Sequence, residues 1–153
     1  RCRAAAQPGA KHFDMTVERL AYLHAAAFPN QRPWSTDEFA RLLESKHIFL
    51  IDKTQCFALG RMIAEDVELL TLATDPAHQQ QGYAQRCLAT FHHTAQTHRA
   101  TRAILEVAAD NIPARQLYEK TGYIKIAERP AYYRKPYGQK IAGLVMIRPL
   151  VGS

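Results

Sequence analysis

The sequence predicts a single layered α/β domain in which helices pack against a β-sheet. The 153 residues are 47% hydrophobic and 22% charged, which is typical of one globular domain and not of disordered or fibrous chains. Apolar segments with helical spacing and short apolar runs follow one another in the order helix, helix, three strands, helix, strand, helix, two strands. We expect residues 15–150 to form this domain. Residues 1–14 are expected to be an N-terminal extension or a first strand, with Met15 a candidate true start.

The first two helices are predicted from apolar spacing and from capping residues. Apolar residues with a helical spacing occupy Val17–Ala27, and the prolines of residues 29–33 end this pattern. Ser35 is followed three positions later by Glu38, which is the arrangement of a capping box. A second helix should therefore begin just after Ser35.

The remaining elements follow from apolar runs bounded by turn residues. We expect strands at residues 47–51, 56–63, 67–74, 102–107, 123–127 and 142–147. The third of these, VELLTLAT, is long and apolar, which indicates a central strand. A third helix should bury Ala84 to Ala95 on one face, and a fourth should begin at Asn111 and stop at Gly122. The last two strands should be joined by a long loop rich in tyrosine.

Charge and cysteine content narrow the functional classes. The chain has 20 basic and 14 acidic residues, and from Arg129 onward it has five basic residues and no acidic one. Such a segment can attract a phosphate-bearing ligand or nucleic acid, and a solvated basic face is the alternative. Three cysteines without a CxxC pair form neither a disulfide framework nor a zinc site. Reduced thiols in a cytoplasmic protein fit this cysteine content best, and no apolar run approaches the roughly 18 residues of a membrane span.

The turn between Thr74 and Ala84 is the first candidate site. A central strand ends, a glycine-containing loop follows and a helix begins, with the spacing Gln79-x-x-Gly82-x-Ala84. Free backbone N–H groups at a helix start, backed by the helix dipole, bind phosphate groups. Gly82 has no side chain, so phosphate oxygens can approach the backbone closely. The spacing matches neither the Walker A loop nor the dinucleotide pattern, and an ordinary strand–helix turn is the alternative.

These residues resemble a known family. Gln79-x-x-Gly82-x-Ala84 is similar to the acetyl-CoA-binding motif Gln/Arg-x-x-Gly-x-Gly/Ala of the Gcn5-related N-acetyltransferases (GNAT). The resemblance covers about residues 17–150, and it extends to Leu105-Glu106-Val107, Asn111, Ala114–Tyr118 and Gly122-Tyr123. It implies a GNAT fold, with a mixed, mostly antiparallel sheet whose central strands splay apart and about four flanking helices. Pro33-Trp34-Ser35 and Tyr132-Tyr133 match the branch that acetylates the N-terminal alanine of a small-subunit ribosomal protein.

The resemblance implies that acetyl-CoA binds between the splayed strands. Its pantetheine would pair with the main chain of Leu72, Ala73 and Thr74. The positions that the resemblance places at the pyrophosphate are Gln80, Gln81, Gly82, Tyr83, Ala84 and Gln85, and Gln79 at the start of the motif is a further expected cofactor-binding residue. Asn111 matches a position whose side chain contacts the cofactor, and a plain helix cap is its alternative role.

Acetyl transfer to an amine requires two proton movements. A terminal amine has a pKa near 8, so roughly a tenth of it is neutral at pH 7. A base must take a proton during attack, and Glu106 matches the base of the family branch. Tyr118 matches the acid that protonates the departing thiolate. The alternatives are a glutamate in an ion pair and a core aromatic residue.

Three histidines, His92, His93 and His98, lie on the third predicted helix. No carboxylate joins them at ligand spacing, so we expect a solvated helix face and no metal site. Cys87 falls on the apolar stripe of the same helix and is expected in the core.

The acceptor is the least determined part of the prediction. The resemblance implies a protein N-terminal α-amine, and Trp34, Tyr132 and Tyr133 match acceptor contacts, with hairpin packing as the alternative for the tyrosines. Small-molecule amines, other protein amines and a catalytically silent acyl-CoA-binding module are the alternative functions. Membrane or direct nucleic-acid partners are not expected. Relative to the family branch, residues 30–32 are inserted and Ala108 replaces an arginine, which affects the acceptor side, and Gln80 replaces an arginine of the pyrophosphate loop.

Overall fold

The computed structural model describes residues 14–135 and 137–150. The expected first strand within residues 1–14 therefore lies almost wholly outside the described residues. The helices are α1 Val17–Ala27, α2 Thr36–Glu44, the short 3-10 helix η1 Pro76–His78, α3 Tyr83–Thr97 and α4 Ile112–Lys120. The strands are β1 Ile48–Asp52, β2 Cys56–Ile63, β3 Asp66–Thr74, β4 Arg102–Ala108, β5 Ile124–Arg134 and β6 Lys140–Pro149. Among the described residues, no helix is long and apolar enough to cross a membrane.

The helices begin and end at residues whose chemistry favours those boundaries. The Thr16 side chain accepts a hydrogen bond from the Arg19 N–H at the start of α1. Ser35 and Glu38 form the predicted capping box of α2. Asn111 caps α4, since its side chain accepts a hydrogen bond from a first-turn N–H at 3.3 Å. The predicted starts of three helices are therefore confirmed.

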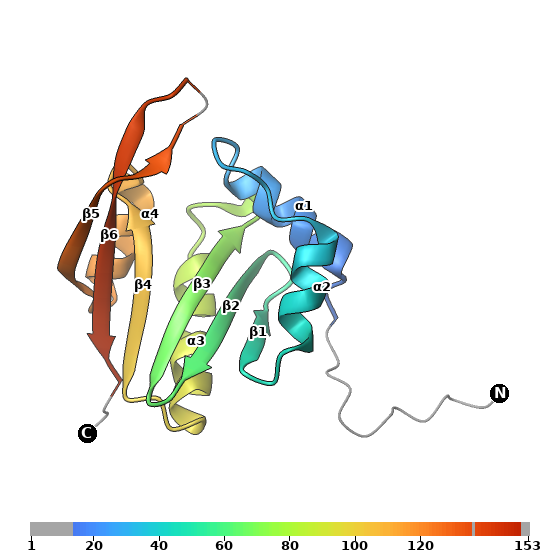
Figure 1. Ribbon diagram of the computed structural model, residues 1–153. Helices are drawn as coiled ribbons and strands as arrows, with labels where there is room; N and C mark the ends of the chain where they lie inside the picture. The colour runs from blue at the N-terminus through green and yellow to red at the C-terminus, as the bar shows by residue number, and fades with distance from the viewer. Residues whose placement is uncertain (1–13, 136, 151–153) are drawn as a thin grey trace.

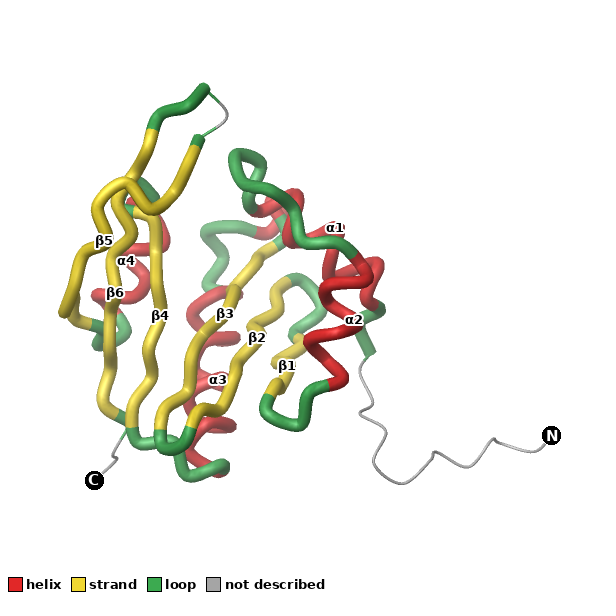
Figure 2. Tube along the Cα trace, in the orientation of Figure 1, coloured by secondary structure: helices red, strands yellow, loops and turns green. Residues whose placement is uncertain are grey.

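The sheet has the order β1-β2-β3-β4-β6-β5 and separates two helical layers. Helices α3 and α4 cover one face, while α1 and α2 cover the other face near β1 and β2 (Figures 1 and 2). All neighbouring strands are antiparallel except β3 and β4, whose parallel pairing ends at Leu69 and Leu105. Beyond these residues the two strands separate. The expected mixed sheet with splayed central strands is confirmed.

A β-bulge in β3 sets which side chains face the α3–α4 layer at the splay. Leu59 of β2 pairs with Thr71 and Gly60 pairs with Leu69, so Leu70 is an extra residue in β3. Before the bulge, Leu69 belongs to the core under α3, whereas Ala73, an even number of residues later, belongs to the core under α1 and α2. The bulge therefore exchanges the two faces of β3.

Two clusters of buried side chains hold the layers together. The cluster under α3 and α4 includes Cys87, Leu88 and Phe91 from α3, so the predicted core position of Cys87 is confirmed. The expected solvated face is wrong for His92, which is only 6% exposed. Its ring is hydrogen-bonded on both sides, which offsets the cost of burying a polar group.

The last hairpin differs from its prediction. Most of the expected tyrosine-rich loop is strand, because β5 continues to Arg134 and Tyr133 pairs with Ile141 of β6. The pairing register shifts between Arg129 and Tyr133, and Ala131 in this interval has a positive φ of 54°. The irregular stretch interrupts the alternating pattern, which is why the sequence indicates a loop there.

Candidate active site

Three neighbouring cavities lie along the splay between β3 and β4. The first, the loop cavity, has a volume of about 470 Å³ and is bounded by the start of α3 and by α4. The second, the central cavity, has about 430 Å³ and is lined by β3, β4 and β5. The third, the outer cavity, has about 670 Å³ and lies between the α1–α2 loop and β5. Leu72 and Tyr118 line both the loop and central cavities, and Trp34 and Tyr133 line both the central and outer cavities. The three cavities therefore adjoin one another.

The loop cavity collects most of the residues expected at the cofactor. Those that line it are Leu72, Thr74, Gln79, Gln80, Gly82, Tyr83, Ala84, Gln85 and Asn111. Ala73 does not, because its fully buried side chain packs on the opposite face of β3. Gln81 is also outside the lining. Phe28, Pro113 and Leu117 add apolar wall that the sequence did not single out.

The start of α3 has the features of an anion site. Gly82 is its N-cap residue with a φ of 79°, and no side chain caps the helix there. The N–H groups of the first turn are thus left for another acceptor, and the helix dipole favours a negative one. A Cβ on Gly82 would lie 2.8 Å from Nη1 of Arg86, in a backbone conformation that side chains rarely adopt. An anionic group is therefore the kind of ligand that this helix start favours.

Arg86 is a basic residue beside the loop that the sequence pattern did not single out. Its Nη1 donates a hydrogen bond to the Gln81 carbonyl at 3.2 Å, and its guanidinium lies over the Tyr83 ring, 4.8 Å from the centroid. The exposed side chain thus folds back beside the loop and brings a positive charge to it. Its position four residues after Gly82, one helical turn on, is the signal that points to it.

Glu106 lies on β4 in the wall of the central cavity. Its neighbours Leu105 and Val107 face the core, so the alternation of the strand turns Glu106 to the other face. Its side chain is 24% exposed, and Oε1 lies 3.1 Å from Nε of Arg129, although no hydrogen bond to that oxygen forms within the described residues. The ion pair that the sequence left as an alternative is therefore present, and the carboxylate also borders the cavity.

Tyr118 lies on α4 between the loop and central cavities. Its ring packs edge-on against Tyr123, with centroids 5.6 Å apart. Among the described residues, its hydroxyl makes no hydrogen bond. Burial raises the pKa of Tyr118 well above its ordinary value, so the hydroxyl keeps its proton at every physiological pH. The residue is therefore a core aromatic that also lines both cavities.

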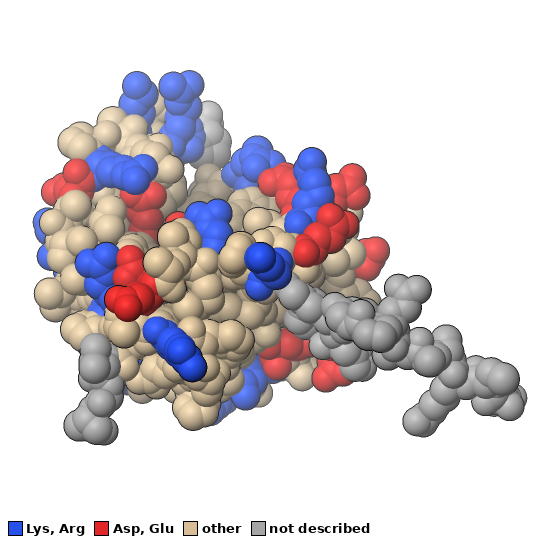
Figure 3. Space-filling model, turned by 60° about the horizontal axis from the view of Figure 1, so that its bottom comes forward, with Lys and Arg blue, Asp and Glu red and all other residues tan. Residues whose placement is uncertain are grey.

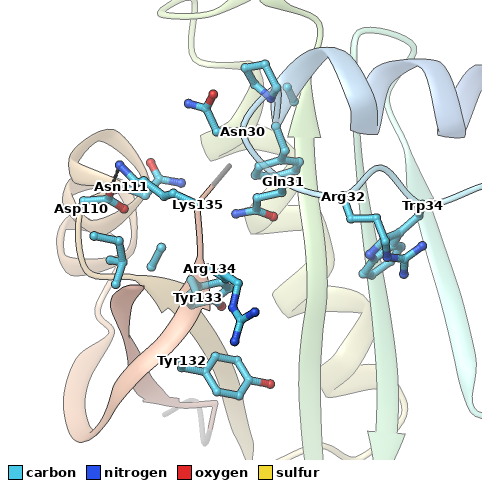
Figure 4. A pocket seen from close by; sticks show the side chains of 15 residues that line it. Asn30, Gln31, Arg32, Trp34, Asp110, Asn111, Tyr132, Tyr133, Arg134 and Lys135 are labelled. Carbon is cyan, nitrogen blue, oxygen red and sulfur yellow. Dashed lines mark ion pairs between the residues drawn. The ribbon is translucent and has the colours of Figure 1, made fainter. Parts of the chain in front are cut away.

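Polar and aromatic side chains from two segments face each other across the outer cavity (Figure 4). The α1–α2 loop contributes Asn30, Gln31 and Arg32, and the end of β5 contributes Tyr132 and Tyr133. The two tyrosine rings are perpendicular, with centroids 5.1 Å apart. Burial and the nearby negative charge of the carboxylate on β4 raise the pKa of Tyr133 to about 12, so its hydroxyl is also neutral.

Charges of both signs are interspersed over the face that Figure 3 shows. Two of the five basic residues of the C-terminal segment pair with carboxylates: Arg129 pairs with Glu106, and Lys135 pairs with Asp110 at the rim of the outer cavity. This segment is therefore partly neutralised by contacts within the fold. Within residues 14–135 and 137–150, no group of three or more His, Cys, Asp or Glu side chains is arranged to hold a metal ion.

Comparisons with known proteins agree with this architecture. The model of the acetyltransferase (GNAT) family matches residues 17–123. The [ribosomal protein bS18]-alanine N-acetyltransferase of Haemophilus ducreyi is 30% identical over 118 residues, covering 74% of this chain and 81% of the relative. The N-alpha-acetyltransferase RimI of Mycobacterium tuberculosis is 32% identical over 127 residues, covering 77% and 78%.

Solved structures show the same fold. The ribosomal-protein-S18-alanine N-acetyltransferase of Escherichia coli superposes with a TM-score of 0.79 at 22% identity, covering 90% of this chain and 89% of that one. Arabidopsis thaliana NAA60, determined in complex with acetyl-CoA, has a TM-score of 0.73 at 17% identity and covers 89% and 94%. With a family match over most of its length and these relatives, the chain belongs to the GNAT family of N-acetyltransferases.

Proposed function

We propose that this acetyltransferase takes its acetyl group from acetyl-CoA and delivers it to the N-terminal α-amine of a protein, with a ribosomal-protein alanine as the preferred acceptor. The observation that carries the proposal is the placement of Glu106 and Tyr118 in one cavity, between a cradle for a diphosphate and a second opening. The names of the relatives support the choice of acceptor. A ribosomal acceptor would place the reaction in the cytoplasm.

The residues around the loop cavity support the proposal that acetyl-CoA is the donor. The first-turn N–H groups of α3 and the guanidinium of Arg86 would hold the diphosphate. Leu72 and Thr74 line the cavity past the end of the β3–β4 pairing, where free main-chain groups would pair with the pantetheine arm. Asn111 caps α4 and also lines the cavity, so the two roles left open by the sequence are compatible.

On the acceptor side, the outer cavity would admit the peptide. Trp34 is stacked on His24, with ring centroids 4.7 Å apart, which fixes one wall of the opening. Tyr132 and Tyr133 form the opposite wall. The preference for an N-terminal alanine is taken from the relatives, which are named as alanine N-acetyltransferases of a ribosomal protein.

Glu106 and Tyr118 would carry the two proton movements. Glu106 takes the proton that the attacking amine loses, directly or through one water. The Tyr118 hydroxyl gives a proton to the departing thiolate, so the products are an amide and a free thiol. Since the amine attacks the acetyl carbon directly, no enzyme nucleophile is required.

A peptide panel tests the proposal. The protein is incubated with acetyl-CoA and, in parallel, with a peptide that begins with alanine, the same peptide blocked at its N-terminus but containing lysine, and a small amine. Release of free CoA and mass spectrometry of the products are measured. We expect acetylation of the free N-terminal alanine alone. Transfer to the lysine or the small amine instead would replace the proposed acceptor, and binding of acetyl-CoA without transfer to any amine would favour the silent module.

A further inference from the structure

A polar chain of three residues, of which His92 and Tyr123 are buried and Arg148 is partly buried, lies beside Tyr118. His92 of α3 lies between Arg148 of β6 and Tyr123, which directly precedes β5. The Arg148 Nη1 atom is 2.6 Å from Nδ1 of His92, and Nε2 of His92 is 2.7 Å from the Tyr123 hydroxyl. His92 is 6% exposed and Tyr123 is 2% exposed.

The chemistry of the three groups fixes the direction of both hydrogen bonds. A guanidinium can only donate, so Nδ1 of His92 must accept from Arg148. In the neutral ring the proton then sits on Nε2, which donates to the Tyr123 oxygen. Burial and the charge of Arg148 lower the pKa of His92 to about 4, which keeps the ring neutral at physiological pH. The chain therefore has one arrangement of donors and acceptors.

This chain ends against the proposed acid. The Tyr123 ring meets the Tyr118 ring at 63° with centroids 5.6 Å apart, and the Tyr123 N–H donates to the Tyr118 carbonyl at 2.9 Å. The Tyr118 hydroxyl itself has no hydrogen-bond partner among the described residues. Its ring is therefore held by packing, and Tyr123 supplies a wall that cannot turn without breaking the bond to His92.

We propose that Arg148, His92 and Tyr123 are positioning residues that hold the Tyr118 hydroxyl where it can protonate the departing thiolate. The inference rests on the proposed role of Tyr118. It extends that role to a network whose two hydrogen bonds, from Arg148 to His92 and from His92 to Tyr123, are 2.6 and 2.7 Å long. A polar chain that served stability alone would affect folding, but it would have no reason to act on turnover through Tyr118.

A double-mutant cycle on turnover separates these two roles. Tyr118→Phe, Tyr123→Phe and the double variant all keep their rings, so each removes only hydroxyl groups. We expect Tyr118→Phe to lower kcat by about 100-fold, as for loss of a proton donor. Tyr123→Phe should lower kcat by about tenfold through misplacement, with the KM values for acetyl-CoA and peptide within about twofold of wild type. In the double variant kcat should equal that of Tyr118→Phe, because there is no longer a donor to misplace.

Each outcome decides between the possibilities. If the two losses multiply, or if Tyr123→Phe leaves kcat unchanged, the positioning role is overturned while the role of Tyr118 stands. If Tyr118→Phe alone turns over at the wild-type rate, the proposed acid fails and the inference fails with it. His93→Ala changes an exposed residue of the same helix and is the matched control. Melting temperatures identify any variant that is unfolded. If Tyr123→Phe is unfolded, His92→Phe replaces it in the cycle with Tyr118→Phe, because it removes the middle residue of the polar chain.

Discussion

Glu106→Gln is the sharpest test of the proposed chemistry. The substitution keeps the shape of the side chain and removes its charge and basicity. Glu106 reaches the central cavity and has Arg129 at 3.1 Å, so the amide can keep a polar partner and the fold should be undisturbed. Loss of a general base costs about 100- to 10,000-fold in rate. We expect kcat at pH 7 to fall by about that range, while the affinity for acetyl-CoA is unchanged.

The rate deficit of Glu106→Gln, which is the ratio of wild-type to variant kcat, should depend on pH, and this dependence tests whether proton removal from the amine is the step that is lost. With an amine pKa near 8, about a tenth of the acceptor is neutral at pH 7 and about nine-tenths at pH 9. A variant without the base depends on the amine that is already neutral, so its rate should climb about tenfold between these pH values. The wild-type rate should climb less, because Glu106 removes the proton itself. The deficit therefore narrows as the pH rises.

The assay is release of CoA thiol from saturating acetyl-CoA with a peptide that begins with alanine, and calorimetry gives the affinity for acetyl-CoA. Glu128→Gln is the matched control, since Glu128 is half exposed, pairs with Lys125 and lies outside the three cavities. A Glu106→Gln enzyme as fast as this control would remove the carboxylate from the mechanism. A deficit of equal size at pH 7 and pH 9 would refute its role as a proton acceptor.

Three other properties follow from the structure. Arg86→Ala should weaken acetyl-CoA binding by about three- to tenfold in calorimetry. The loss of affinity should be smaller at high salt, because the charge of Arg86 is exposed. An unchanged affinity would contradict its place at the diphosphate. Gly60→Ala should lower the free energy of unfolding by about 2 kcal/mol in urea titration, since the added Cβ would lie 2.5 Å from the buried Phe91 ring; no loss would show that the core can yield there. Burial lowers the pKa values of His24 and His92 to about 4. Between pH 6.5 and pH 4 the unfolded chain therefore binds more protons than the folded chain, and the free energy of unfolding should fall as the pH falls. A free energy of unfolding that stays constant over this range in denaturant titrations would contradict both shifts.

Local patterns in the sequence were sufficient for most of the fold. The bounds of β2 are the predicted ones, and the capping box at Ser35 and the cap at Asn111 start their helices as expected. These features depend on neighbours in the chain, so spacing and residue type reveal them. The mixed sheet with separated central strands came from the family resemblance, because strand order is a long-range property that spacing does not carry.

The sequence-based predictions fail where the environment of a side chain is set by residues far away in the sequence. His92 reads as one of three surface histidines on a helix, yet Arg148 and Tyr123, 56 and 31 residues away in sequence, satisfy its ring in the core. Arg86 lies outside the loop motif in sequence, and only the helical geometry returns its side chain to the loop. For Glu106 the sequence left a catalytic base and an ion pair as alternatives; the structure contains the ion pair, and the residue also lines the central cavity.

The shape of the site depends on two interruptions of regular strand pairing. The extra residue Leu70 exchanges the faces of β3, which turns Leu72 and Thr74 toward the loop cavity and leaves Ala73 in the opposite core. The irregular stretch around Ala131 sits immediately before the tyrosines of the outer cavity, and its positive φ costs roughly 1 kcal/mol that a regular strand would not incur. Regular pairing along both strands would present the alternate faces to the cavities. One irregularity lies beside the loop cavity and the other beside the outer cavity. We therefore infer that the irregularities in the strands, more than the loops, orient the side chains that contact the donor and the acceptor.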